Sequence, residues 1–151
     1  MADQITQPSS LSAEDVHAML LANEDILVVD VRRTDFEGIC IKGAVNLPAQ
    51  SFLATLPALL PILSLHKVVL FHCGSSRGRG PRVAGWYQDA LNEHNITVSR
   101  AAVLIGGINA WQERYAGDRL TLRLPEPAEQ PASVKEAISI DTPQPSATNN
   151  A

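Results

Sequence analysis

The sequence predicts an α/β fold built on an open, mainly parallel sheet with helices on both of its faces. Apolar runs of strand length, at 26–31, 68–71 and 101–105, alternate with segments whose apolar residues recur at helical spacing. The first two runs are continuous rather than alternating, as expected of strands that are covered on both sides. With 45% hydrophobic and 5% aromatic residues, the 151-residue chain can build one aliphatic core.

The elements before the second run follow from local signals. Residues 1–10 are polar, and we expect them to be loose. Ser12 is placed to cap a helix that ends near Ala22, because acidic residues follow it in the first turn. After the first strand, a short strand is expected at 44–47. Residues 51–63 should be helical in places, but their two prolines predict a kink or a division.

The second half repeats the alternation. A helix over 81–95 carries one apolar stripe, and a closing helix over 108–115 should pack Trp111 inward. From residue 125 onward, proline and polar residues dominate, so that segment cannot bury enough apolar surface to order itself. The predicted organisation is a flexible N-terminus at 1–10, one domain at 11–124 and a disordered tail at 125–151.

Charge and composition exclude several classes of function. The net charge is −4, but residues 11–125 hold 11 acids and 11 bases, which gives nucleic-acid binding no support. Two cysteines are too few for a disulfide framework and lack metal-ligand spacing, so no metal is expected. The chain shows neither a secretory signal nor a membrane span. We therefore expect no membrane partner and a cytoplasmic location, with the nucleus as a second compartment.

One stretch carries the chemistry, where the strand at 68–71 runs into Cys73. Glycines at 74, 78 and 80 let the backbone bend so that its N–H groups point at one spot. Pro81 suits the first turn of a following helix. Strand, tight loop and helix start together form a cradle for an anion.

A thiol in this cradle loses its proton more easily beside the helix N-terminus and Arg79. Arg79 can bind two oxygens of a tetrahedral oxyanion, so the thiolate of Cys73 could attack phosphorus, arsenic or sulfur. The alternative is a buried structural cysteine beside a surface loop. The segment 77–82 argues against it, because it holds three arginines and no acid to neutralise them.

Several separated segments resemble the rhodanese fold. Asp30-Val31-Arg32 ends the first strand, and 41–48 resembles that fold's "hIxGAxNxP" segment, with Cys40 in place of the usual histidine. Gly106-Gly107, followed by Trp111, resembles its closing "GGxxxW". The resemblance spans residues 11–115 and implies a sheet of about five strands.

The length of the cysteine loop distinguishes the branches of that fold. Sulfurtransferases use a shorter loop, whereas cell-cycle dual-specificity phosphatases and eukaryotic arsenate reductases use C-x5-R. His72-Cys73, five residues, and then Arg79-Gly80-Pro81-Arg82 resemble the longer class. The resemblance implies that Cys73 is the nucleophile and Arg79 the oxyanion-binding residue. It also implies a set of oxyanion-binding and supporting residues: Gly74, Ser75, Ser76, Arg77, Gly78, His72, Asp30 and Arg82.

Some of these roles remain open. His72 would orient the cysteine region, and Asp30 more readily braces a loop than performs chemistry. Arg77 and Arg82 would attract anions or are simply solvated surface charges. Two positions depart from the cell-cycle phosphatases: Gly78 stands where a loop glutamate is frequent, and Val31 where those enzymes carry a second cysteine. Whether Cys40 replaces that cysteine is left open.

The leading functional hypothesis is arsenate reduction, and hence arsenic resistance. No bound cofactor is expected; glutathione would be the reducing co-substrate and a glutaredoxin a partner. The first alternative is a tyrosine or dual-specificity phosphatase acting on a phosphate ester through a phospho-cysteine. The further alternatives are a thiosulfate sulfurtransferase and a non-catalytic rhodanese module.

Overall fold

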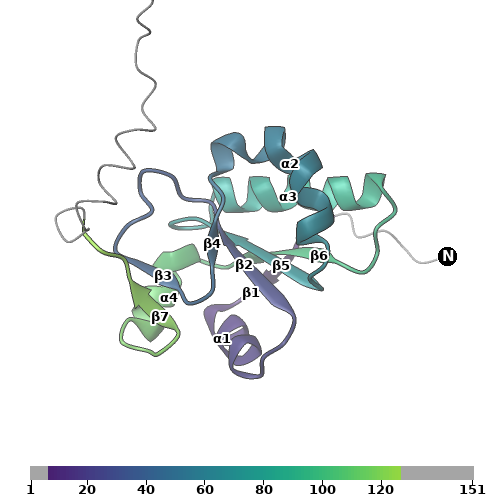
Figure 1. The fold of residues 1–151 in the computed structure, drawn as a ribbon. Coiled ribbons are helices and arrows are strands. Elements are labelled where there is room, and N and C mark those ends of the chain that lie inside the picture. Colours follow the sequence, from purple (N-terminus) through teal and green to yellow (C-terminus); the bar gives the residue numbers. More distant parts are fainter. Residues whose placement is uncertain (1–6, 127–151) are drawn as a thin grey trace, which may run out of the picture.

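The computed structural model describes residues 7–126, and its centre is a five-stranded sheet (Figure 1). All neighbouring strands in it are parallel, in the order β1-β6-β5-β2-β4. The strands are β1 (Ser9–Leu11), β6 (Arg100–Leu104), β5 (Val68–His72), β2 (Ile26–Asp30) and β4 (Val45–Asn46). The predicted fold class is confirmed, since helices also cover both faces.

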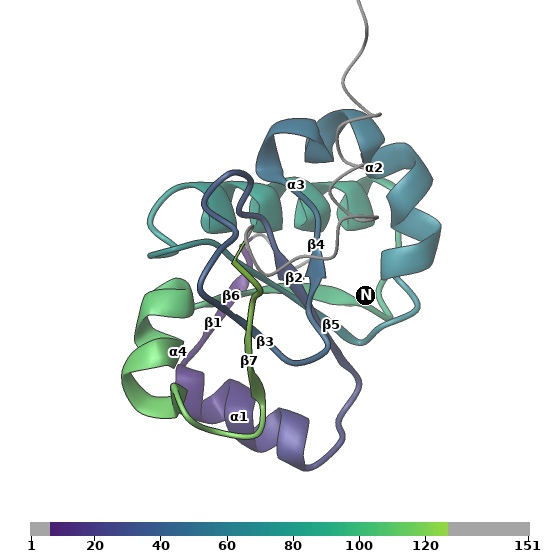
Figure 2. The ribbon, with the colours of Figure 1, turned by 60° about the vertical axis from the view of Figure 1, so that its left-hand side comes forward.

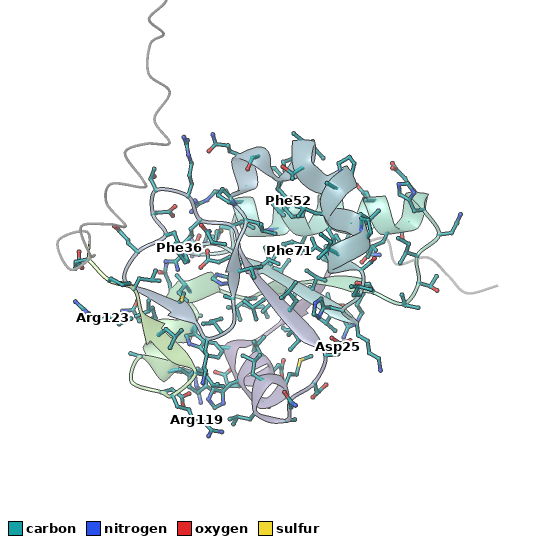
Figure 3. All side chains as sticks on the ribbon, viewed as in Figure 1. Asp25, Phe36, Phe52, Phe71, Arg119 and Arg123 are labelled. Atoms are coloured by element: carbon teal, nitrogen blue, oxygen red, sulfur yellow. The ribbon has the colours of Figure 1, made fainter. Side chains whose placement is uncertain are left out.

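Two pairs of helices enclose the sheet (Figures 1 and 2). α2 (Ala49–Leu63) and α3 (Arg79–Glu93) lie on one face, while α1 (Ala13–Leu21) and α4 (Gly107–Tyr115) lie on the other. Each face has its own apolar cluster. On the first face, Phe52 of α2 meets Phe71 of β5 edge to face, with ring centres 5.6 Å apart (Figure 3). Trp111 of α4 is fully buried on the second, as predicted.

Helix α2 corrects the expectation of a divided segment, because it runs unbroken through Pro57 and Pro61. A proline in a helix interior removes a hydrogen bond and costs about 3 kcal/mol. Both prolines are exposed, so the carbonyls that lose their partners lie on the side that faces water. The opposite side buries a row of large apolar side chains that holds the helix to the sheet: Phe52, Leu56, Leu60 and Leu63.

The ends of the fold extend beyond the predicted elements. Ser9 and Ser10, expected to be loose, belong to β1, which pairs with β6. A second, antiparallel pair was not predicted: β3 (Ile39–Ile41) pairs with β7 (Thr121–Arg123). The rest of the predicted N-terminal segment, 1–6, and the tail at 127–151 lie outside the described residues. Within residues 7–126, no helix combines the length and apolar character needed to cross a bilayer.

The topology brings two loops together at one edge of the sheet. β2 and β5 are parallel neighbours in which Asp30 pairs with His72, the last residue of each strand. The backbone N–H of Val31 still donates to the carbonyl of His72, at 2.9 Å. The segments that follow, 31–38 and 73–78, therefore leave the sheet side by side. This carboxyl edge is where open α/β sheets place their sites.

Candidate active site

The loop from Cys73 to Gly78 joins β5 to α3 and folds around the sulfur atom of Cys73. Only 3% of Cys73 is exposed. The backbone N–H of Gly80, in the first turn of α3, points at its Sγ from 3.4 Å. Ser76 adopts a left-handed backbone conformation, with φ of 56°, and its Oγ faces the Cys73 amide at 3.5 Å. The loop is thus a tight turn around a buried thiol.

The amides of this loop are available to an anion. Among the residues that the structure describes, none of the backbone N–H groups of Gly74, Ser75, Ser76, Arg77 and Gly78 donates a hydrogen bond to another protein group. Gly74, Ser75 and Ser76 are half-buried, and half-buried amides normally find an acceptor, whereas Arg77 and Gly78 are exposed. Successive free N–H groups before a helix are the kind of donor set that binds an anion, so the predicted cradle remains open to this role.

The carbonyls of the same loop face the opposite way, toward α4. The amides of Ile108 and Asn109 donate to the carbonyl oxygens of Cys73 and Gly74, both at 3.0 Å. This approach requires glycine at 107, which has a φ of 58° and whose added side chain would meet both carbonyls. The sequence indicates only that Gly106 and Gly107 end a strand and resemble the closing "GGxxxW" segment of the rhodanese fold. The contact of Gly107 with the cysteine loop was missed.

Arg79 is held by a carboxylate that the sequence analysis did not single out. Its Nη1 donates to Oδ1 of Asp35 at 2.9 Å, and its Nη2 donates to Oδ2 at 2.6 Å. The guanidinium holds the pKa of the Asp35 carboxyl well below its usual range, chiefly through these hydrogen bonds. Asp35 in turn raises the pKa of Arg79. One feature of the sequence could have indicated this contact. Two apolar runs typical of parallel strands precede Asp35 and Arg79, and the loops that follow parallel neighbours leave the sheet at the same edge.

The loop that carries Asp35 is anchored by a buried ion pair. Arg32 and Asp30 are 4% and 0% exposed, and their closest charged atoms are 2.8 Å apart. Arg32 also donates to the backbone carbonyls of Asp35, Glu37 and Ile39, at 3.4, 3.1 and 2.7 Å. Five donors in a rigid plane make arginine suited to this task. Asp30 therefore helps to fix the conformation of the loop, because it holds Arg32 in place.

His72 lies beneath the cysteine with its ring fully buried. Its Nδ1 is 3.1 Å from the carbonyl of Cys73. Its Nε2 is 3.7 Å from Oδ2 of Asp30, which is too long for a hydrogen bond, and has no partner among the described residues. Burial lowers the pKa of His72, and the charge of Asp30 opposes this only in part. These contacts indicate that the imidazole ring of His72 is neutral and that its Nδ1 fixes the Cys73 carbonyl.

The other cations of the segment point outward. Arg77 and Arg82 are exposed, and no carboxylate within residues 7–126 pairs with either. Arg77 lines a cleft of about 560 Å³ beside the loop, together with Pro8, Ser76, Pro81, Val103 and Ile105. The role of Arg77 and Arg82 in attracting anions stays a prediction.

Cys40 belongs to β3 and not to the cysteine loop, and it is buried and forms no disulfide within the described residues. Burial raises the pKa of its thiol, and the charge of Asp30 adds to the effect. This thiol is therefore kept protonated.

Comparison with known proteins places this site in a family. The model of the rhodanese-like domain matches residues 12–114. The dual specificity phosphatase ibp1 of Schizosaccharomyces pombe is 30% identical over 112 residues, which are 63% of this chain and 80% of that protein. Arsenate reductase 2.1 of Oryza sativa is 32% identical over 107 residues, 69% of this chain and 67% of that protein.

A solved structure agrees with these relatives. Ygr203w, described as a yeast protein tyrosine phosphatase of the rhodanese family, superposes with a TM-score of 0.70 at 27% identity. The match covers 81% of this chain and 97% of that one. The chain therefore belongs to the rhodanese-like family. Arsenate reductase and phosphatase relatives identify it as a cysteine-dependent enzyme of that superfamily.

Proposed function

We propose that the protein is an arsenate reductase in which Cys73 is the nucleophile and Arg79 holds the oxyanion. The free amides of residues 74–78 would bind the remaining oxygens. The amide of Gly80 points at Sγ from 3.4 Å, so the sulfur atom lies at the N-terminus of α3. A thiolate beneath a bound tetrahedral anion is placed for attack on its central atom.

One observation carries the choice of arsenate over a phosphate ester. The ester oxygen of a phosphate ester leaves with a proton from a nearby acid, whereas arsenate carries O–H groups of its own, so the oxygen that it loses can leave as water. Position 78 of the loop is glycine. Asp35, the carboxyl beside Arg79, stays ionised because its pKa is held far below neutrality. The site thus lacks a ready proton donor in the place where a phosphatase would use one.

The reaction that we propose balances as follows. The sulfur of Cys73 forms a bond to arsenic as an As–O bond breaks, and the departing oxygen leaves as water with a proton that the arsenate itself carries. One glutathione thiol then displaces a second oxygen as water and binds arsenic through its sulfur. A second glutathione attacks that sulfur, so that glutathione disulfide leaves and As(V) becomes As(III). Water finally cleaves the bond between Cys73 and As(III), which releases arsenite and regenerates the Cys73 thiol. The sum is arsenate and two glutathione to arsenite, glutathione disulfide and water. A glutaredoxin would resolve the mixed adduct, and the reducing cytoplasm would keep both thiols available.

The test is NADPH consumption that depends on arsenate, with glutathione, glutaredoxin and glutathione reductase present. We expect turnover by the full chain and none by Cys73→Ser. Cys40→Ser is the matched control, since its thiol lies outside the loop, and it should remain active. Equal rates for the wild type and Cys73→Ser would end the proposal.

A phosphatase that works through a phospho-cysteine is the second candidate, because the same thiol and cradle would accept a phosphate ester. The names of two relatives favour it. Hydrolysis of p-nitrophenyl phosphate and of a phosphotyrosine peptide separates the two candidates. p-Nitrophenolate leaves without a proton donor, so turnover of that ester but not of the peptide would agree with the missing acid. Thiocyanate formation from thiosulfate and cyanide would instead indicate a sulfurtransferase.

A further inference from the structure

We propose that Asp35 is a positioning residue for Arg79: it grips one edge of the guanidinium so that the other edge faces an oxyanion in the cradle. The inference rests on the proposed role of Arg79 as the oxyanion-binding residue. It adds a residue from a different loop to the site and gives that residue a task.

The geometry of the pair leaves donors free for a second anion. Asp35 accepts one hydrogen bond from Nη1 and one from Nη2, in two parallel hydrogen bonds of 2.9 and 2.6 Å. A guanidinium has five N–H donors in a plane. The Nε–H and one further proton on each terminal nitrogen therefore remain. The edge formed by Nε and one Nη can bind two oxygens of a tetrahedral anion while Asp35 stays in place.

Asp35 is itself fixed, which a positioning residue must be. The backbone N–H of Arg33 donates to Oδ1 of Asp35 at 3.1 Å, and this sets its rotamer. The carbonyls of Asp35, Glu37 and Ile39 are held by Arg32, so the whole loop is anchored to buried Asp30. An ordered chain of contacts thus runs from the sheet to the guanidinium.

Arg79 needs such a holder because its side chain is 38% exposed and long. A free arginine samples many rotamers, and ordering it on ligand binding lowers affinity by about tenfold. Arg79 directly precedes Gly80, whose amide lies 3.4 Å from the Cys73 sulfur, so the held guanidinium extends from the rim of the same loop. The pair is too exposed to matter much for stability, since such pairs contribute little. Its effect should therefore appear in binding.

A competing interpretation makes the opposite prediction. If Asp35 only opposed the substrate, as a second negative charge beside it, removing that charge would tighten oxyanion binding. Positioning predicts weaker binding instead. The sign of one measured change therefore separates the two roles.

The experiment is calorimetric titration of the full chain with inorganic phosphate. We expect Asp35→Ala and Asp35→Asn to raise the dissociation constant by about tenfold, and Asp35→Glu, which keeps the carboxylate, to restore part of the affinity. Asp89→Ala is the charge-matched control, because it removes an exposed acid from α3 away from the loop, and it should bind like the wild type. Thermal unfolding checks that each variant is folded.

A double-mutant cycle tests whether Asp35 acts through Arg79. In an Arg79→Lys background, where the planar guanidinium is lost, Asp35→Ala should cause no further loss of phosphate affinity. Additive losses would overturn the proposal, as would tighter or unchanged binding in Asp35→Ala and Asp35→Asn. Because phosphate binding requires no turnover, this result stands apart from the arsenate assay. Failure of reductase activity with the expected binding pattern would reject the function and keep the positioning role.

Discussion

Gly107 lies so close to Cys73 that a side-chain carbon built on it would stand 2.5 Å from the Cys73 carbonyl oxygen. It would also stand 2.6 Å from the carbonyl oxygen of Gly74, and its φ of 58° is one that side chains rarely adopt. The first turn of α4 is therefore fitted against the back of the cysteine loop. The loop amides can face a ligand because the carbonyls are occupied on this side.

Replacing Gly107 with alanine should damage both stability and activity. The left-handed conformation alone costs about 1–2 kcal/mol with a side chain, and the contact with backbone oxygens adds to it. We expect the melting temperature to fall by several degrees and arsenate turnover to fall with it. Gly117→Ala is the control, because a side chain there meets nothing within 4 Å. Equal melting temperatures for the two variants would contradict this account.

Gly80→Ala should separate activity from stability. The added carbon would lie 3.2 Å from Oγ of Ser76 and 3.2 Å from the α carbon of His72, so the cysteine loop must shift. In the same helix, Gly85 has open space around it, and Gly85→Ala should stabilise α3 by up to about 1 kcal/mol. We expect turnover to drop in the first variant and to persist in the second. Urea unfolding and steady-state rates measure the two effects.

Stability should fall as the pH drops below 6.5, the ordinary pKa of histidine, because of His72. Burial lowers the pKa of this ring in the folded protein, so the unfolded chain binds its proton first as the pH falls. The loss is at most about 1.4 kcal/mol per pH unit, between 6.5 and the lowered pKa. Free energies of unfolding at pH 7.5 and about 5.5 test this in the wild type and in His72→Gln. The variant should lose less stability, and an equal loss would assign the effect to other groups.

Arg32→Lys should destabilise the fold, although it keeps the charge. Lysine cannot reproduce the contacts of the guanidinium with Asp30 and with the carbonyls of Asp35, Glu37 and Ile39. Breaking a buried pair costs about 3 kcal/mol, which urea denaturation can resolve. Arg33→Lys is the matched control on an exposed neighbour. Equal stability of the two variants would show that the planar contacts of Arg32 matter little.

The central strands and most helices could be predicted because their patterns reflect burial. The runs ending at Asp30 and His72 are apolar without interruption, as two-sided burial requires. The strand at Ser9–Leu11 could not be read, since a short polar segment at a sheet edge has no such pattern. The unbroken helix through Pro57 and Pro61 depends on which of its sides faces water. That is a property of the tertiary fold.

The candidate site likewise has one part that the sequence predicts and another that it does not. The loop from Cys73 to Arg79 is contiguous, so its spacing alone predicts a cradle. Asp35 and Gly107 reach it from distant segments, and their roles depend on strand order and on the approach of α4. A lone aspartate in a loop carries no signal of its partner. The contacts that hold a site in shape are long-range and therefore the hardest to predict.

The pairing of β3 with β7 has a consequence for shortened forms of the chain. The amide of Leu124 donates to the carbonyl of Gly38 at 2.7 Å, and Thr121 receives the indole N–H of Trp111 at 2.7 Å. After α4, the polypeptide thus returns to pair with the segment that begins just beyond Asp35. A deletion that removes residues from Thr121 onward would spare every residue of the C-x5-R motif. It would nevertheless release the distant segment on which the orientation of Arg79 depends, so an intact motif is no guarantee of a working enzyme.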